Sequence, residues 1–208
     1  MLHNIQSEFI AGLRATSAEA IKIIEMVLCG EVNQLLVRKL NAAGVRAVGL
    51  SGADQQMLLC NYFSQQHGFV GEIKTVNSEI IQHILASDNC IPVIASIGTD
   101  EEGNALNINA DLAACQIANT LAVDQLIYLT DQAGIFDHEG KVYTQLTAAE
   151  LQTLIHEKIV KAGMLIKVKA ILASLTSSLR EIHILNGNQA QILPDLLLSQ
   201  KNQELFVR

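Results

Sequence analysis

Short apolar runs alternate along this chain with longer segments in which apolar residues recur every three or four positions. The run Ile91–Ile97 (IPVIASI) has the length of a strand and is typical of one covered on both faces. Further strands are predicted at 45–50, 68–76, 126–129 and 182–185, and helices at 16–44, 77–85, 109–121, 147–155 and 164–177. Strands separated by helices predict an α/β fold, a three-layer sandwich with a largely parallel sheet. The 208 residues contain no repeat or linker, so we expect one domain, 1–208.

Two of the helices begin with the residues of a capping box, a hydroxyl residue followed three positions later by Glu. These are Thr16 with Glu19 and Thr147 with Glu150. Asn77 is a further candidate cap, and Gly44 is placed where a helix would end.

Composition narrows the possible functions. Half of the residues are hydrophobic and 17% are charged, which provides for a sizeable core. A net charge of −7 without basic runs argues against nucleic acid as a partner, but a small anionic ligand needs only a locally positive pocket. No segment resembles a membrane span or a signal peptide, so we expect a cytoplasmic protein. The four Cys form no CxxC pair, which favours buried thiols and predicts no metal site.

Several polar residues are candidates for ligand binding. Arg14 precedes a predicted helix, and a guanidinium can bind a carboxylate through two parallel hydrogen bonds. An ordinary surface arginine is the alternative. Asn107, Asn109 and Asp111 form N-x-N-x-D, and alternation would place all three side chains on one side of an extended segment. The alternative is an Asn-rich turn with Asp111 in the first turn of a helix, where the dipole favours it.

Two further candidates lie nearer the C-terminus. Lys167 stands in the apolar sequence MLIKVKAIL, either as a functional lysine or as one whose stem covers apolar surface. Residues 130–136 (TDQAGIF) follow a predicted buried strand, and ligands of open α/β sheets bind at the carboxyl ends of strands. An ordinary turn with Gly134 at positive φ is the alternative.

The chain resembles the N-acetylglutamate kinases of the amino acid kinase family. The resemblance lies in FIAGLRATSAEAIKIIEMVLCGEVNQLLV, VRAVGLSGAD, GFVGEIKTVN, IPVIASIG, NINAD, LTDQAGIFD and GMLIKVKA. These segments occur in the family's order and cover nearly the whole chain. The resemblance implies the amino acid kinase fold, a homo-oligomer, and ATP-dependent phosphorylation of the side-chain carboxylate of N-acetyl-L-glutamate in arginine biosynthesis.

The resemblance also implies roles for individual residues. Arg14, Asn107 and Asn109 would bind acetylglutamate, Asp111 would orient catalytic lysines, and Lys167 would neutralise the transferring phosphoryl group. ATP would be bound by the following residues, the last three near the adenine: Thr130, Asp131, Gly134, Ile135, Phe136, Ile159, Val160 and Lys161. Mg²⁺ would be held mainly through the nucleotide phosphates. The acceptor carboxylate is already ionised at neutral pH, so the reaction needs charge compensation and no general base.

The sequence departs from the family pattern in two places. The family begins with a strand carrying Lys-x-Gly-Gly and a second strand leading to His-Gly-Gly-Gly, and neither motif occurs here; residues 1–7 contain no Gly and no Lys. Ala53 stands where the family commonly has Lys. A non-catalytic ligand-binding or regulatory subunit is therefore the alternative function. A Rossmann oxidoreductase is disfavoured because G-x-G-x-x-G follows no predicted strand.

Overall fold

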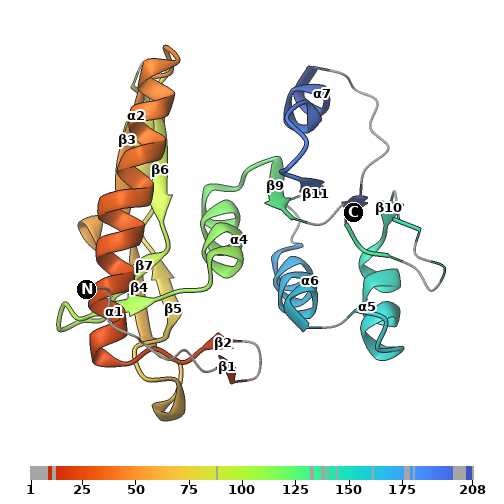
Figure 1. The fold of residues 1–208 in the computed structure, drawn as a ribbon, viewed down its shortest axis with the longest axis horizontal. Helices are drawn as coiled ribbons and strands as arrows, with labels where there is room; N and C mark the ends of the chain where they lie inside the picture. Colours follow the sequence, from red (N-terminus) through yellow and green to blue (C-terminus); the bar gives the residue numbers. More distant parts are fainter. Residues whose placement is uncertain are drawn as a thin grey trace. The chain divides into compact units, whose positions relative to one another are not determined.

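The computed structural model of the chain describes residues 9–10, 13–87, 89–131, 134–136, 139, 141–143, 145–160, 162–175, 179, 181–198 and 205–207. The chain divides into two compact units, Met1–Leu121 (unit 1) and Ala122–Arg208 (unit 2). Figure 1 shows the elements of both units. The prediction that residues 1–208 form one domain depends on how the two units are joined, and it stays a prediction.

Unit 1 combines a long helical segment with eight strands of the described chain. The helical elements are α1 (Ala18–Glu25), η1 (Met26–Asn33), α2 (Gln34–Ala42), η2 (Asp54–Gln56), η3 (Gln65–His67), α3 (Glu79–Leu85) and α4 (Ala110–Leu121). The strands are β1 (Phe9–Ile10), β2 (Leu13–Arg14), β3 (Ala47–Ser51), β4 (Leu58–Tyr62), β5 (Gly71–Val76), β6 (Ile91–Ala95), β7 (Ile97–Thr99) and β8 (Ala105–Asn107).

The strands of unit 1 form both parallel and antiparallel pairs. β3 and β6 pair in parallel, and a separate sheet has the order β5-β4-β7-β8. In that sheet β4 pairs with β7 in parallel, whereas the hairpin partners β4–β5 and β7–β8 are antiparallel. The apolar run 91–97 is thus divided between β6 and β7. β6 is not covered on both faces as expected, because Ile91 is exposed and its next three residues are only half-buried.

The core of unit 1 lies between its four-stranded sheet and the helices α3 and α4. Its fully or nearly buried apolar side chains come from strands and helices far apart in the sequence: Met57, Leu58, Cys60, Ile81, Leu106, Ile108 and Ala113. This packing fixes the position of β8 and of the start of α4, which carry the N-x-N-x-D sequence.

The first helix begins one residue later than the capping-box prediction. Ser17, not Thr16, is the N-cap of α1, and its hydroxyl oxygen accepts from the N–H of Ala20 (3.2 Å). Glu19 accepts from the Ser17 hydroxyl (3.0 Å). Thr16 is instead buried in an isolated bridge with Gly68. The prediction for Thr16 was wrong because the bridge removes it from the helix end.

The helical segment that follows is continuous in Figure 1, but its middle, η1, is a π-helix. η1 and α2 lie against β3 and β6. Asn33, which is buried, donates from Nδ2 to the carbonyl oxygens of Leu50 (3.2 Å) and Val93 (2.8 Å) and so connects the two parallel strands. The apolar residues Met26 and Leu36, which recur at helical spacing, are exposed.

Unit 2 has the order of elements expected of an α/β protein. Its helices are α5 (Ala148–His156), α6 (Ala162–Ser174) and α7 (Ile192–Leu198), and its strands are β9 (Gln125–Thr130), β10 (Gln145–Leu146), β11 (Glu181–Asn186) and β12 (Leu205–Val207). The sheet order is β10-β12-β11-β9. β9 and β11 pair in parallel along their full length. Four residues of β11, 182–185, are buried and form the centre of this unit.

The α/β class and the parallel strand pairs are confirmed, as are most predicted elements. The second capping box is also confirmed: Thr147 Oγ1 accepts from the N–H of Glu150 (3.2 Å), and Glu150 Oε2 accepts from the N–H of Thr147 (2.7 Å). Gly44 follows the end of α2 with φ of 84°. The Asn77 side chain accepts from the N–H of Glu79, although Ser78 is the N-cap of α3.

Within the part of the chain that the structure describes, no helix is long and apolar enough to cross a membrane.

Candidate functional site

Three segments of unit 1 that are distant in sequence meet around Thr16. Its N–H donates to the carbonyl oxygen of His67 (3.0 Å), and its carbonyl oxygen accepts from the N–H of Phe69 (2.8 Å). The N–H of Asn107 donates in turn to the carbonyl oxygen of Phe69 (2.9 Å), and Val70 forms a bridge with Asn107. The segment after Arg14 and the end of β8 are therefore both held by backbone hydrogen bonds to residues 67–70.

A side-chain link joins the same segments. Asn107 Nδ2 donates to Thr16 Oγ1 (3.2 Å), and the Thr16 hydroxyl donates to the carbonyl oxygen of Arg14 (3.1 Å). The structure thus places two predicted substrate-binding residues, Arg14 and Asn107, two hydrogen bonds apart. The Arg14 side chain is exposed at the end of β2, and Asn107 is half-buried at the end of β8.

The loop between β4 and β5 has the residues that allow the Thr16 backbone to approach it closely. Gly68 has φ of 61°, and a Cβ there would collide with the carbonyl oxygen of Thr16. His67 is buried, forms a hydrogen bond with Ser64 Oγ through Nδ1 (2.7 Å), and packs edge-on against Phe63. Glycine at 68 and a well-packed His67 therefore let the Thr16 backbone lie directly on the loop.

The remaining residues of N-x-N-x-D lie at the start of α4. Asn109 Oδ1 accepts from the N–H of Leu112 (3.1 Å), so Asn109 caps the helix. Ile108 between the two asparagines is buried, as alternation along an extended segment predicts. Asp111 is already inside α4, in its first turn, where its charge is favoured by the helix dipole. The helix begins too early for Asp111 to continue the extended alternation.

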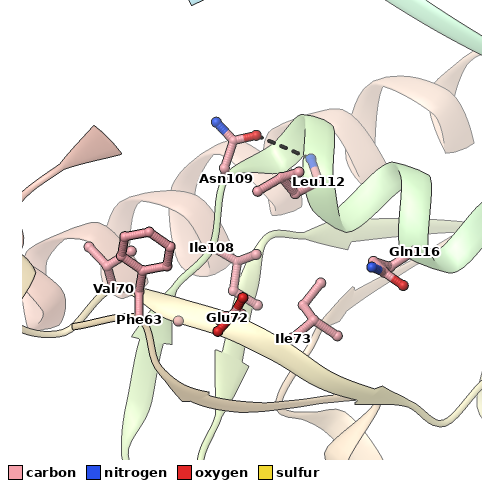
Figure 2. A pocket seen from close by; sticks show the side chains of 9 residues that line it. Phe63, Val70, Glu72, Ile73, Ile108, Asn109, Leu112 and Gln116 are labelled. Atoms are coloured by element: carbon pink, nitrogen blue, oxygen red, sulfur yellow. Dashed lines mark hydrogen bonds between the residues drawn. The ribbon is translucent and has the colours of Figure 1, made fainter. Parts of the chain in front are cut away.

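A pocket of about 170 Å³ lies beside this segment, between β5 and α4 (Figure 2). Phe63 and Val70 line one side and Gln116 the other, with Asn109 and Leu112 at the start of α4. The full lining is Phe63, Val70, Gly71, Glu72, Ile73, Ile108, Asn109, Leu112 and Gln116. Most of this wall is apolar, and Glu72 contributes its one charged group.

In unit 2, the carboxyl ends of β9 and β11 lie side by side. Thr130, the last residue of β9, is in register with Asn186, the last residue of β11. Gly187 donates its N–H to the carbonyl oxygen of Thr130 (2.8 Å), and the Thr130 hydroxyl donates to Asp131 Oδ1 (3.2 Å). Asp131 is exposed at this edge. The turn after Thr130 and the turn after Asn186 together form the sheet edge where a ligand of an α/β protein is expected, whereas the sequence pointed only to the first of them.

The other residues expected at the nucleotide site lie in two short segments. Gly134 has φ of 141°, which glycine adopts readily, Ile135 is buried, and Phe136 is exposed and forms a bridge with Val142. Ile159 is half-buried and Val160 buried, and the N–H of Ile159 donates to the carbonyl oxygen of Leu154 (3.0 Å) at the end of α5. Lys161 lies outside the described residues.

Lys167 projects from α6 over an aromatic ring. Its Nζ is 5.2 Å from the ring centre of Tyr128, a distance at which the ring's negative face attracts a cation. Tyr128 is buried in β9, two residues before Thr130. Lys169, two residues along the helix, is exposed. The α6 face that carries Lys167 is thus directed to β9, the strand that ends at Thr130.

The predicted site residues therefore form two groups. Arg14, Asn107, Asn109 and Asp111 belong to unit 1, and the nucleotide-side residues and Lys167 belong to unit 2. The expectation that Arg14, Asp111 and Lys167 share one cleft joins the two units and stays a prediction. Ala53 is exposed in the turn after β3. No group of three or more potential metal-binding side chains occurs among the residues described.

Sequence reasoning missed two residues of these groups. Thr16 was assigned to a helix cap, and Asn186 only to a strand end. A preceding Arg in GLRAT could have directed attention to Thr16, but the neighbouring Ser17 offers the same capping chemistry. The strand-end Asn-Gly of 186–187 was a usable signal for the edge shared with Thr130.

Comparison with known proteins shows the family of this chain. The family model described as "Amino acid kinase family" matches residues 1–186. The chain is 40% identical to the acetylglutamate kinase of Campylobacter curvus (strain 525.92) over 94% of its own length and 68% of that relative. It is 42% identical to the acetylglutamate kinase of Clostridioides difficile (strain 630), over 88% of its own length and 65% of that relative. It thus spans about two thirds of the length of these curated relatives.

A solved structure supports the fold. The N-acetylglutamate synthase of Neisseria gonorrhoeae, solved with coenzyme A and N-acetyl-glutamate, superposes with a TM-score of 0.86 at 21% identity. The match covers 97% of this chain and 46% of the synthase. At that identity the similarity concerns the fold alone. The family match over 1–186 and the 40% identity to an acetylglutamate kinase show that the chain belongs to the amino acid kinase family and is acetylglutamate kinase-like in sequence.

Proposed function

We propose that this chain binds N-acetyl-L-glutamate in unit 1 and ATP in unit 2, and that it serves the phosphorylation of the acetylglutamate side-chain carboxylate. The observation that carries the proposal is the convergence of Arg14 and Asn107 on Thr16. Two hydrogen bonds separate the Arg14 backbone carbonyl from the Asn107 carboxamide, and an arginine and an asparagine on neighbouring segments suit a ligand that carries a carboxylate beside an amide. The identity of 40% to an acetylglutamate kinase supports acetylglutamate among such ligands.

The pocket beside β5 suits the apolar part of this ligand. Phe63, Val70 and Ile73 offer apolar surface, whereas the Glu72 carboxylate would repel an anionic group. We therefore expect the methyl and methylene groups of acetylglutamate on this side and its carboxylates on the side of Arg14. A volume of about 170 Å³ suits part of a small ligand.

The nucleotide is proposed to bind at the edge formed by the ends of β9 and β11. Thr130 and Asp131 supply polar groups there, and Gly134, Ile135 and Phe136 form the following turn. Ile159, Val160 and Lys161 would lie near the adenine. Mg²⁺, held through the phosphates, would compensate negative charge when bound. The role of Lys167 would be to neutralise the transferring phosphoryl group from its position over Tyr128.

Calorimetric titration of N-acetyl-L-glutamate into the full chain tests the substrate side. Arg14→Ala should weaken binding roughly 10- to 100-fold, the usual effect of losing a charge-assisted hydrogen bond. Arg38→Ala removes an exposed arginine of α2 and is the matched control, for which we expect unchanged affinity. A folded wild-type chain that does not bind the ligand would contradict the proposal.

Release of ADP from ATP in the presence of acetylglutamate tests the transfer step. Lys167→Ala should abolish release above background, while Lys169→Ala, two residues along the same helix, should retain it. If all three proteins bind acetylglutamate and show the same background rate, the chain acts as a ligand-binding subunit without turnover. A cytoplasmic location and a homo-oligomeric state belong to the same proposal; sedimentation velocity would measure the latter.

A further inference from the structure

The hydroxyl of Thr16 is buried, so it does not face solvent, and it does not cap helix α1. The residue is 2% exposed, and Ser17 performs the capping of α1. Both backbone groups of Thr16 are already bound to the loop, its N–H to His67 and its carbonyl oxygen to Phe69. A buried hydroxyl costs free energy unless it is hydrogen-bonded. The role of the hydroxyl therefore follows from its two hydrogen-bond partners, the Arg14 backbone carbonyl and the Asn107 carboxamide.

The partners determine the direction of each hydrogen bond. A carbonyl oxygen can only accept, so the Thr16 hydroxyl must donate its proton to the Arg14 carbonyl (3.1 Å). Thr16 Oγ1 then has only lone pairs to offer to Asn107. The Asn107 atom that lies 3.2 Å away must consequently be the amide nitrogen, Nδ2, and not the oxygen. The Arg14 backbone thus selects one of the two flip states of the Asn107 carboxamide.

The backbone of Asn107 is fixed independently. Its N–H donates to the Phe69 carbonyl (2.9 Å), and it forms a bridge with Val70. The principal freedom left to its side chain is rotation of the planar amide, which would exchange donor and acceptor. With Nδ2 tied to Thr16, Asn107 has Oδ1 and a second N–H left for a ligand.

We propose that Thr16 is a positioning residue, which holds the Asn107 carboxamide in the flip state that binds an N-acylated amino acid. The inference rests on the proposed function, because it presumes acetylglutamate binding at Asn107. A carboxamide fixed in this way offers one acceptor and one donor at defined places. A ligand with an amide N–H next to a carboxylate can use both. Without Thr16 the amide would spend part of its time reversed, and binding would have to select the correct orientation.

A double-mutant cycle with calorimetric titration of N-acetyl-L-glutamate tests the proposal. Thr16→Val keeps the shape and removes the hydroxyl; with both flip states of the Asn107 amide then equally populated, binding should weaken about 2-fold. Thr16→Ser keeps the hydroxyl and should bind as the wild type does. In an Asn107→Ala background, Thr16→Val should cause no further loss, because there is no carboxamide left to orient.

The outcomes separate this inference from the proposed function. One outcome is that Thr16→Val weakens acetylglutamate binding equally in the wild type and in Asn107→Ala. That result would overturn the positioning role alone, because it would show that Thr16 acts on binding independently of the Asn107 carboxamide. Absence of binding by the folded wild type would overturn the proposed function and the inference with it.

A second measurement does not depend on the Thr16→Val variant folding. In the nitrogen-15 spectrum of the unliganded wild type, the side-chain N–H₂ signals of Asn107 are assigned by their loss in Asn107→Ala. The proton that faces Thr16 should exchange with solvent more slowly than its partner. Equal exchange of the two protons would show that the amide is not held and would overturn the inference.

Discussion

At Gly68 the Thr16 carbonyl lies so close to the β4–β5 loop that a Cβ would collide with it, and replacing Gly68 tests how the substrate-side group is assembled. Gly68 has φ of 61° and ψ of −125°, a region that residues with a Cβ rarely adopt. Holding alanine there costs about 1–3 kcal/mol. Its Cβ would also displace the Thr16 carbonyl and weaken the hydrogen bond from Phe69, which adds about 1 kcal/mol.

We therefore expect Gly68→Ala to lower the free energy of unfolding by about 2–4 kcal/mol. Urea denaturation followed by circular dichroism measures this change. Gly103→Ala is the matched control, because Gly103 has φ of 86° but a Cβ there would meet no atom within 4 Å. The control carries the backbone cost without the collision and should lose about 1–2 kcal/mol.

The same variant should weaken acetylglutamate binding, because movement of Thr16 releases Asn107. Equal losses of stability in Gly68→Ala and Gly103→Ala would refute the steric part of the reasoning. Unchanged acetylglutamate affinity in Gly68→Ala would refute the connection between the loop and the binding residues.

Three further predictions concern other parts of the chain. Burial raises the pKa of Cys60 to about 11, so iodoacetamide at neutral pH should modify Cys60 far more slowly than the half-buried Cys90, and equal rates would contradict this. Burial, only partly offset by Glu181, lowers the pKa of His183 below 6.5, so the unfolded chain takes up a proton first and stability should fall as pH drops below about 6.5. Unfolding curves of His183→Leu should depend less on pH in this range; parallel pH profiles would exclude His183 as the cause. Thr147→Ala removes the α5 cap and should cost about 1 kcal/mol in urea denaturation, with no loss expected if the cap is dispensable.

The elements that local chemistry specifies could be predicted from the sequence. The capping box at Thr147 needs only a hydroxyl and a carboxylate three residues apart, and it formed as predicted. Apolar runs marked β3, β6, β9 and β11 because a strand in a sheet must cover at least one face. The family resemblance pointed to Arg14 and Asn107, which the structure connects through Thr16.

Strand pairing could not be read in the same way. An apolar run predicts a strand but not its neighbour, and the run 91–97 contributes to two different sheets: β6 pairs with β3, and β7 with β4 and β8. The π-helical middle of the first helical segment was also hidden, because its apolar spacing was read as α-helical. There Asn33 bonds to carbonyl groups of both β3 and β6, which local spacing does not reveal.

The sequence by itself determined the α/β class, most helix and strand positions, and the family to which the chain belongs. Only the tertiary structure decided between Thr16 and Ser17 as the helix cap, two adjacent hydroxyl residues with the same local chemistry. The decision came from residues 67–69 and from Asn107, which is 91 positions away from Thr16. Capping and periodicity act between residues a few positions apart, whereas the partner of a buried hydroxyl is set by which distant backbone the fold brings against it.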